Sequence, residues 1–159
     1  MEEKKRKLSM VVFSGDMDKL MAAFIIGTGA AASNMDVTMF FTFWGLRALK
    51  KPVNTGKGFF GKMLGLMYGG DIRKAGPSKF NFYGMGRWMF KKMMAGKGVL
   101  SMVEFRNLAL ELGIKFYPCS MSMDVLEIED KDFIKEAQPS VGVGFFIAEA
   151  LESQITLFI

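Results

Sequence analysis

The sequence predicts an α/β fold in which a mostly parallel sheet of about five strands is flanked by helices. Short β-type apolar runs alternate with longer helix-like stretches along the chain. The run at residues 36–43 is almost continuously hydrophobic, as expected of a parallel strand that is covered on both faces. With 159 residues, half of them hydrophobic, the chain can bury a substantial core. We therefore expect one domain over residues 1–159.

The first third of the chain predicts strand, helix, strand, helix. The strands are expected at residues 8–13 and 36–43, and the helices at residues 17–32 and 44–51. The turn residues Ser14, Gly15 and Asp16 separate the first strand from the alanine-rich first helix.

The second half repeats this alternation after Gly113, which is well placed to end a helix over residues 99–112. Strands are expected at 114–117 and 155–158, with a brief strand or glycine turn at 139–144. Helices are expected at 122–128, 132–137 and 145–154. In such a parallel arrangement a functional site belongs at the carboxyl ends of the strands.

Residues 27–32 match the G-x-G-x-x-A pattern that cradles a dinucleotide pyrophosphate. That pattern must open a helix, yet only three residues separate it from the next strand. We therefore expect these glycines and alanines to pack closely at the end of the first helix, with no tight binding of NAD or FAD.

An insertion at about residues 52–98 interrupts the alternation. It is rich in Gly, Met, Phe and Lys, and residues 51–98 hold ten basic side chains and one acid, a net charge of +9. The rest of the chain carries −4, since the whole carries +5. Large apolar residues recur in the insertion at helical spacing with lysines between them. They suit core or oligomer packing, docking of an acidic protein, or peripheral contact with an anionic membrane.

The chain contains no histidine and a single cysteine. Ser-His-Asp and Cys-His hydrolases lose their usual base, and most zinc and iron sites lose their commonest ligand. One cysteine forms no internal disulfide, and the apolar run at 8–13 is shorter than the core of a signal peptide. We expect a cytoplasmic protein with no metal, no cofactor, no transmembrane span and no nucleic-acid partner.

Cys119 lies where a strand is expected to run into a helix. Backbone N–H groups and the helix dipole at such a position favour the thiolate, which makes Cys119 a candidate nucleophile. Ser120 and Ser122 are suited to capping the helix or donating to the sulfur. A phosphatase loop would need arginine where Val125 stands, and a thioredoxin-type pair would need cysteine at 122. The alternative is a buried cysteine that packs as a small hydrophobe.

Further candidates for the pocket follow the neighbouring strands. Asp16 and Trp44 are expected at the same sheet edge as Cys119, where they line a pocket, or else cap a helix and fill the core. Asp124 is expected to support its helix from the first turn. Gly142 and Gly144 either allow close approach to a ligand or form a plain turn.

The residues 10–16, the block Cys119-x-x-Ser122-Met123-Asp124 and the ending at 142–158 resemble the DsrE/DsrF-like family of sulfur-relay proteins, in particular its DsrE-like, peroxiredoxin-like branch. The resemblance implies a Rossmann-like three-layer sandwich and a homo-oligomer. It also implies a cysteine that carries sulfane sulfur between a donor and an acceptor.

The function predicted from these observations is a sulfurtransferase or sulfur carrier that holds a persulfide on Cys119. Its partners would be sulfur donor and acceptor proteins or low-molecular-weight persulfides. One alternative is a non-enzymatic oligomeric subunit that docks partners in a sulfur or redox complex. Another is a thiol-dependent protein that handles peroxide, although no resolving cysteine is present.

Overall fold

The sheet at the centre of the molecule has four parallel strands in the order β3-β2-β1-β4. The strands are β1 (Lys7–Val12), β2 (Asp36–Phe41), β3 (Lys115–Pro118) and β4 (Ile155–Phe158). The computed structural model describes residues 5–159, so residues 1–4 of the expected domain lie outside the described residues. The predicted α/β class and parallel sheet are confirmed, with four strands instead of about five.

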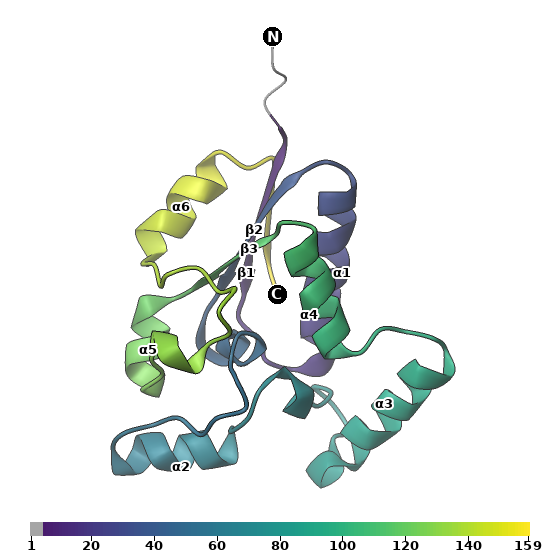
Figure 1. Cartoon of the computed structure of the whole chain (residues 1–159), viewed down its shortest axis with the longest axis vertical. Helices are drawn as coiled ribbons and strands as arrows, with labels where there is room; N and C mark the ends of the chain where they lie inside the picture. The colour runs from purple at the N-terminus through teal and green to yellow at the C-terminus, as the bar shows by residue number, and fades with distance from the viewer. Residues whose placement is uncertain (1–4) are drawn as a thin grey trace.

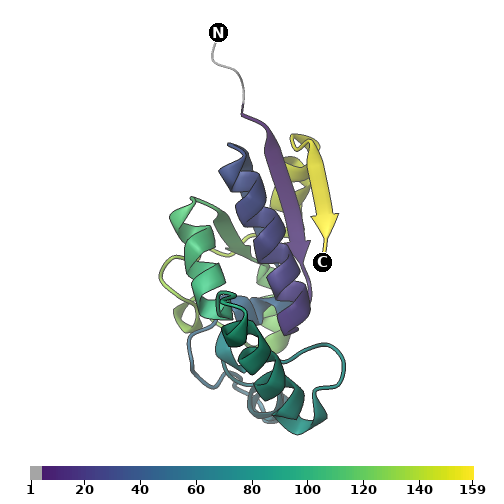
Figure 2. The same cartoon turned by 90° about the vertical axis from the view of Figure 1, so that its right-hand side faces the viewer.

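Helices cover both faces of the sheet and give the expected three layers (Figure 1). On one face, α1 (Met17–Ala32) packs beside α4 (Met102–Glu111). On the other lie α5 (Ser120–Leu126) and α6 (Val143–Leu151). Figure 2 shows β4 beside β1 at one edge of the sheet, with α1 alongside.

Because side chains alternate between the two faces along each strand, the strands contribute to two hydrophobic clusters of unequal size, one on each face of the sheet. On the side of α1 and α4, a large cluster includes Met10, Met39 and Phe116, all fully buried. On the side of α6, the buried cluster consists of Phe40, Cys119 and Phe146. Val11 and Tyr117 pack against this second cluster. Each is adjacent in sequence to a residue of the large cluster and therefore points to the opposite face of the sheet.

The crossover from β2 to β3 contains the predicted insertion. It runs through the 3₁₀ turn η1 (Phe43–Ala48), α2 (Phe59–Met67), η2 (Ile72–Lys74), η3 (Phe82–Gly84) and α3 (Met85–Gly96) before reaching α4. These elements lie beyond the carboxyl ends of the strands, at the bottom of the molecule in Figure 1. The helix predicted over 44–51 is thus a 3₁₀ turn. Its Gly45 passes so close to the backbone of Val12 that a Cβ atom would overlap the Val12 carbonyl.

One further predicted helix is wrong, and the segment expected as a brief strand or glycine turn contributes a single bridge. The helix expected at 132–137 is absent, because the backbone of Phe133 pairs with Lys50 and the Ile134 N–H donates to the carbonyl of Leu49 at 2.8 Å. The brief strand expected at 139–144 is reduced to one bridge between Val141 and Cys119, since the next residue already caps α6. This bridge stands in place of the missing fifth strand.

The glycine pattern at 27–32 lies in the last turns of α1 and opens no helix, as expected. Gly27 is buried, and a Cβ atom there would overlap the methyl group of Met39. Close packing against β2 therefore explains this glycine. Among residues 5–159, no helix is both long and apolar enough to cross a membrane.

Candidate functional site

Cys119 is held by hydrogen bonds to three parts of the chain. Its N–H donates to the carbonyl of Phe41 at 2.8 Å, which ties it to the end of β2. The N–H of Ser120 donates to Val141 at 3.0 Å, and the carbonyl of Cys119 accepts from Met123 at 3.1 Å. Cys119 is the N-cap residue of α5, with extended backbone. The strand-to-helix position predicted from the sequence is thus where the residue lies, and α5 begins two residues earlier than expected.

Cys119 belongs to the buried cluster on the α6 side of the sheet, and the residue as a whole is 7% exposed. It packs in the small cluster with Phe40 and Phe146, whose rings stack at 5.4 Å. Tyr117 and Phe145 lie beside this cluster with ring centroids 4.4 Å apart. Phe146 of α6 therefore packs with the cysteine, and little of this residue is open to solvent.

Two backbone N–H groups at the start of α5 have no acceptor among the described residues. The first turn of a helix leaves N–H groups without intrahelical acceptors. In α5 the N–H of Ser120 is taken by Val141, whereas no acceptor among the described residues pairs with Met121 or Ser122. The Cys119 side chain makes no capping hydrogen bond. These N–H groups are of the kind that stabilises a sulfur anion.

The polar neighbours named from the sequence lie differently around this turn. Ser122 is buried, and its hydroxyl shares a 2.7 Å hydrogen bond with the hydroxyl of Thr42. Ser120 is half-buried, and Asp124 is exposed. The prediction that Asp124 supports the first turn is wrong, because α5 begins at Ser120 and places Asp124 beyond that turn. The Thr42 to Ser122 bond joins the ends of β2 and β3 beneath the cysteine turn, a contact that sequence analysis did not foresee.

Asp16 and Trp44 meet each other at the same sheet edge, in a separate cavity. This cavity of about 240 Å³ is lined by Ser14, Gly15, Asp16, Trp44 and Tyr68. The Tyr68 hydroxyl donates to the Trp44 carbonyl at 3.3 Å, and burial raises the pKa of Tyr68 to about 12. Asp16 accepts from the Ser14 hydroxyl at 3.0 Å and makes no capping hydrogen bond. Cys119 does not line this cavity, so the predicted pocket residues fall into two groups.

Gly142 and Gly144 flank the beginning of α6, the segment that covers the thiol. Gly142 is its N-cap residue, and both glycines are exposed. A Cβ atom at either position would meet nothing within 4 Å. Their environment is therefore open, with no close backbone approach at either residue.

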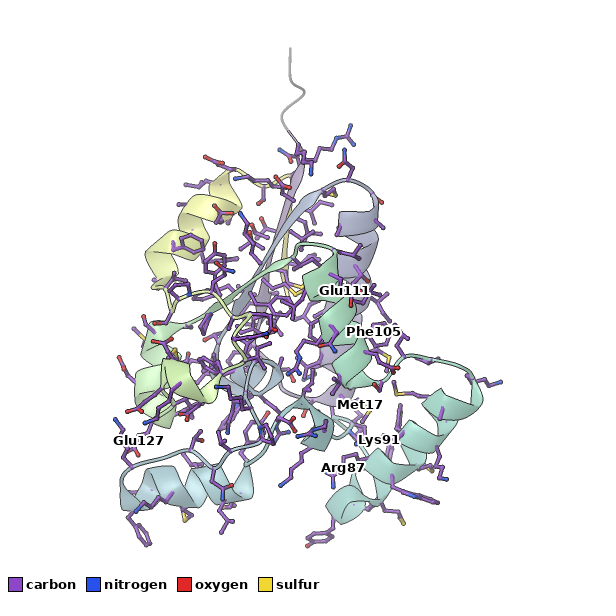
Figure 3. The ribbon with its side chains drawn as sticks, in the orientation of Figure 1. Met17, Arg87, Lys91, Phe105, Glu111 and Glu127 are labelled. Carbon is purple, nitrogen blue, oxygen red and sulfur yellow. The ribbon has the colours of Figure 1, made fainter. Side chains whose placement is uncertain are left out.

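The other end of α5 is tied to the insertion. Glu127 follows the last turn in left-handed conformation, with φ 52°, and its carboxylate accepts from the N–H groups of Lys57 and Gly58, the latter at 2.7 Å. Those two hydrogen bonds lower the pKa of Glu127. Figure 3 shows Glu127 between α5 and the beginning of α2. The seven-residue helix therefore joins the cysteine turn to α2.

Sequence analysis also missed three buried cations near this edge. Arg47, Lys50 and Arg106 are each at most 9% exposed, and none forms an ion pair with a described carboxylate. Desolvation lowers the pKa of each, and the charge of Arg47 lowers that of Lys50 further. Arg47 and Lys50 stand three residues apart in an otherwise apolar segment, which is the signal that could have revealed them.

Cys119 places a thiol at the start of α5, a position where backbone N–H groups favour a sulfur nucleophile. Within residues 5–159, no group of three His, Cys, Asp or Glu side chains is arranged to hold a metal ion. A single thiol can accept an electrophilic sulfur atom and release it to another thiol, because each transfer breaks one S–S bond and forms another.

Solved structures share this fold at low sequence identity. The ychN protein from E. coli superposes with a TM-score of 0.57 and 10% identity, covering 97% of this chain and 99% of its own. MTH1491 from Methanobacterium thermoautotrophicum gives 0.55 and 9%, covering 98% and 100%.

Sequence relatives span the whole chain. YrkE, an uncharacterised protein of Bacillus subtilis, is 42% identical over 161 residues, covering all of both proteins. The sulfur carrier protein DsrE2 of Allochromatium vinosum is 33% identical over 158 residues, covering 98% of this chain and 99% of its own. The model of the DsrE/DsrF/DrsH-like family matches residues 4–158. The chain therefore belongs to the DsrE/DsrF/DrsH-like family.

Proposed function

We propose that the protein is a sulfur carrier or sulfurtransferase in which Cys119 holds sulfane sulfur as a persulfide. Membership of the family and the similarity to a sulfur carrier protein support a role in sulfur relay. The observation that carries the finer proposal is the position of the chain's one cysteine at the start of α5, beside the unpaired N–H groups of Met121 and Ser122. In this scheme these donors stabilise the thiolate and then the persulfide anion.

The transfer needs neither oxidant nor reductant. The Cys119 thiolate attacks the outer sulfur of a donor persulfide, forms the new S–S bond and releases the donor as a thiolate. The proton on the outer sulfur stays with it or passes to the departing thiolate. An acceptor thiolate then attacks the same outer sulfur, and Cys119 leaves as the thiolate with which it began.

Access to the sulfur is the step that the fold must supply. We propose that the beginning of α6 swings outward to admit the donor, since Phe146 packs in one cluster with Cys119, a residue that is 7% exposed. The open surroundings of Gly142 and Gly144 suit such a movement. Ser120 and Asp124, at the outer side of the turn, are then the side chains that a docking partner meets. We further propose a homo-oligomer in a reducing cytoplasm as the setting.

Intact mass spectrometry tests the proposal. After incubation with glutathione persulfide, the protein should gain one sulfur atom that dithiothreitol removes, and Cys119→Ser should gain none. The matched control is Cys119→Ser/Val125→Cys, which moves the thiol to an exposed position on the same helix. If that variant loads and releases sulfur as fast as the native protein, the position of Cys119 has no role and the proposal fails.

A second candidate is a non-enzymatic subunit that docks partners in a sulfur or redox complex. The exposed apolar side chains of α2 and α3 favour it. In that case Cys119→Ser would leave assembly and the activity of the complex unchanged. A peroxide-handling thiol would instead appear in the same mass measurement as added oxygen after treatment with hydrogen peroxide.

A further inference from the structure

Helix α2 is built with its small residues inward and its large apolar residues outward. Gly61 and Gly65 are its buried residues, and a Cβ atom at Gly65 would overlap the carbonyl of Thr55. Phe59, at 79% exposed, and Leu66, at 77%, project away from the body of the protein. A helix on the surface of a soluble domain normally shows the opposite arrangement.

Helix α3 shows this arrangement in part, because Met94 is buried in the large core and Phe90 packs against it, while other large side chains face outward. Gly86 is buried against the backbone of Phe80, and a Cβ atom there would overlap the Phe80 carbonyl. Trp88 is 63% exposed, and Met85, Met89 and Met93 are also exposed. The exposed aromatic and methionine side chains of the two helices favour an apolar environment at their outer surface.

The two helices occupy the same end of the molecule, beyond the carboxyl edge of the sheet (Figure 1). We call α2 and α3 together the α2–α3 base. With nine and twelve residues, they are about 14 and 18 Å long at 1.5 Å per residue. Both are too short for a hydrocarbon core of about 30 Å. They are suited to lying flat in an interface, with their apolar side immersed.

The charge around the base is almost entirely positive. Residues 51–98 carry a net charge of +9, and their one acid, Asp71, is buried and pairs with Arg73 at 2.8 Å. Lys62 is an exposed member of α2, and Lys92 of α3. Two copies of this surface would repel each other, whereas an anionic surface would attract it.

A basic pocket opens between the two helices. This cavity of about 420 Å³ is bounded by the end of α2, the following loop and the first turn of α3, and its cations are Arg47, Lys74 and Arg87. Figure 3 shows Arg87 at the beginning of α3. The acid in the lining, Asp16, lies 3.6 Å from Lys19 and accepts from a serine.

The cations of this pocket have spare capacity for an anion. Arg47 is nine-tenths buried, lies 3.6 Å over the ring of Tyr68 and donates from Nη2 to the Tyr68 carbonyl at 2.9 Å. Its Nε has no hydrogen-bond partner among the described residues. Arg87 donates from Nη1 to the carbonyl of Lys74. Neither Arg87 nor Lys74 pairs with a described carboxylate, and the three cations of the lining face one acid, Asp16, so the pocket carries an excess of positive charge.

We propose that the α2–α3 base docks on an anionic phospholipid bilayer, with the phosphate of one lipid headgroup in the basic pocket. A bilayer provides an apolar layer for the outward side chains and phosphate groups at the depth where the lysines and arginines lie. An acidic protein would match the charge but would also need a matching apolar surface against both helices. The proposal goes beyond the sulfur-carrier function and does not depend on it, so Cys119→Ser should bind vesicles as the native protein does.

Co-sedimentation with vesicles tests the docking. The protein should sediment with phosphatidylcholine vesicles containing phosphatidylglycerol and stay in solution with phosphatidylcholine alone. Phe60→Ser should weaken binding by about ten-fold or more, because a large apolar side chain loses its burial. The matched control is Leu151→Ser, on the exposed side of α6, which should bind normally. Equal binding to both kinds of vesicle, or none to either, would overturn the proposal and leave a protein partner for the base.

Variants of the pocket test the headgroup contact. Arg87→Gln and Lys74→Gln should each weaken vesicle binding by about five-fold or more, which is the effect of one cation near an anionic surface. Lys115→Gln, at the other end of the sheet, should leave it unchanged. Soluble inorganic phosphate at millimolar concentration should compete weakly. Complete displacement of the vesicles by phosphate would identify a free-phosphate site and contradict the lipid assignment.

The fluorescence of Trp88 gives an independent measurement of depth. Trp44 and Trp88 are the two tryptophans of the chain, so Trp44→Phe leaves Trp88 as the reporter. On anionic vesicles its emission should shift to the blue, and lipids brominated on the acyl chains should quench it. Emission that stays unshifted on bound vesicles would show purely electrostatic adhesion and would contradict immersion of the helices.

Discussion

The two faces of the sheet are covered to very different depths. The face under α1 and α4 contains the large core, in which Phe24 and Phe116 are fully buried. The face under α6 has a buried cluster of Phe40, Cys119 and Phe146 alone. Uncovering a residue on the first face means unfolding the protein, whereas the second needs only the displacement of one short helix. Cys119 thus lies on the face of the sheet that has the smaller buried cluster.

The largest expected effect on stability comes from a substitution in the large core under α1 and α4. Phe24→Ala should lower the free energy of unfolding by about 3–5 kcal/mol, because it removes a fully buried ring that packs on Phe116 at 6.0 Å. Urea denaturation would measure this loss. Under native conditions the alkylation rate of Cys119 should stay the same, and a parallel increase in that rate would show that the two faces open together.

A substitution in the small cluster under α6 should cost less stability and should increase the reactivity of Cys119 more. Phe146→Ala should cost about 3 kcal/mol or less, since its cluster is small and can collapse. It should also raise the rate at which iodoacetamide modifies Cys119 by about ten-fold, corresponding to about 1.4 kcal/mol less opening free energy. Phe158→Ala, an exposed ring on β4, is the control. An unchanged rate in Phe146→Ala would mean that α6 does not gate the thiol.

The hydrogen bond between the hydroxyls of Thr42 and Ser122 should contribute less to stability than either phenylalanine. Thr42→Val leaves the buried Ser122 hydroxyl without its partner and should cost about 1–3 kcal/mol. The double variant Thr42→Val/Ser122→Ala should lose less unfolding free energy than the two single variants together. Chemical denaturation of the native protein and all three variants gives this double-mutant cycle. Strict additivity would show that the 2.7 Å contact carries no coupling.

The smallest effect concerns pH and the attachment of α2. Hydrogen bonds from Lys57 and Gly58 lower the pKa of Glu127, while Lys131 and Lys57 lower that of Glu129 to about 2. Carboxylates with lowered pKa values stabilise the fold fully above their ordinary value of 4.5 and lose that contribution as pH falls through the folded values. Amide exchange at Gly58, corrected for its intrinsic rate, should therefore accelerate between about pH 4.5 and 2.

Glu127→Gln gives the control for this pH effect. At pH 7 it removes the charge that binds the first N–H groups of the α2 segment, so amide exchange at Gly58 should already be faster than in the native protein. Its remaining dependence on acid should be shallower. If the native protein and the variant respond identically to acid, Glu127 has no part in holding α2.

Local sequence patterns were sufficient where an element depends on its own residues. Helix α1 and strand β4 lie at the predicted positions, 17–32 and 155–158. The strand-to-helix position of Cys119 was also predictable, because the strand ends in a proline and a serine-rich turn follows. The helix expected at 132–137 failed because the backbone of Phe133 and Ile134 pairs with residues more than 80 positions earlier. Local propensity contains no information about such a contact.

The arrangement of the site could be predicted only in part. Parallel strands do bring Asp16, Trp44 and Cys119 to one edge, as the topology requires. Their separation into two groups depends on which face each side chain points to, and on Tyr68, which arrives from the insertion to pack against Trp44 at 4.7 Å. The burial of the thiol likewise depends on α6, which follows it by more than twenty residues.

Helix α5 connects the cysteine turn with the segment that leads into α2. Cys119 caps its beginning and Glu127 its end, and seven residues span about 10 Å. A displacement of α2 would act on the carboxylate of Glu127, and through it on α5, whose Met123 belongs to the large core and whose Leu126 packs against that core. The insertion and the cysteine turn are therefore connected through one short helix and through the part of the core that this helix forms.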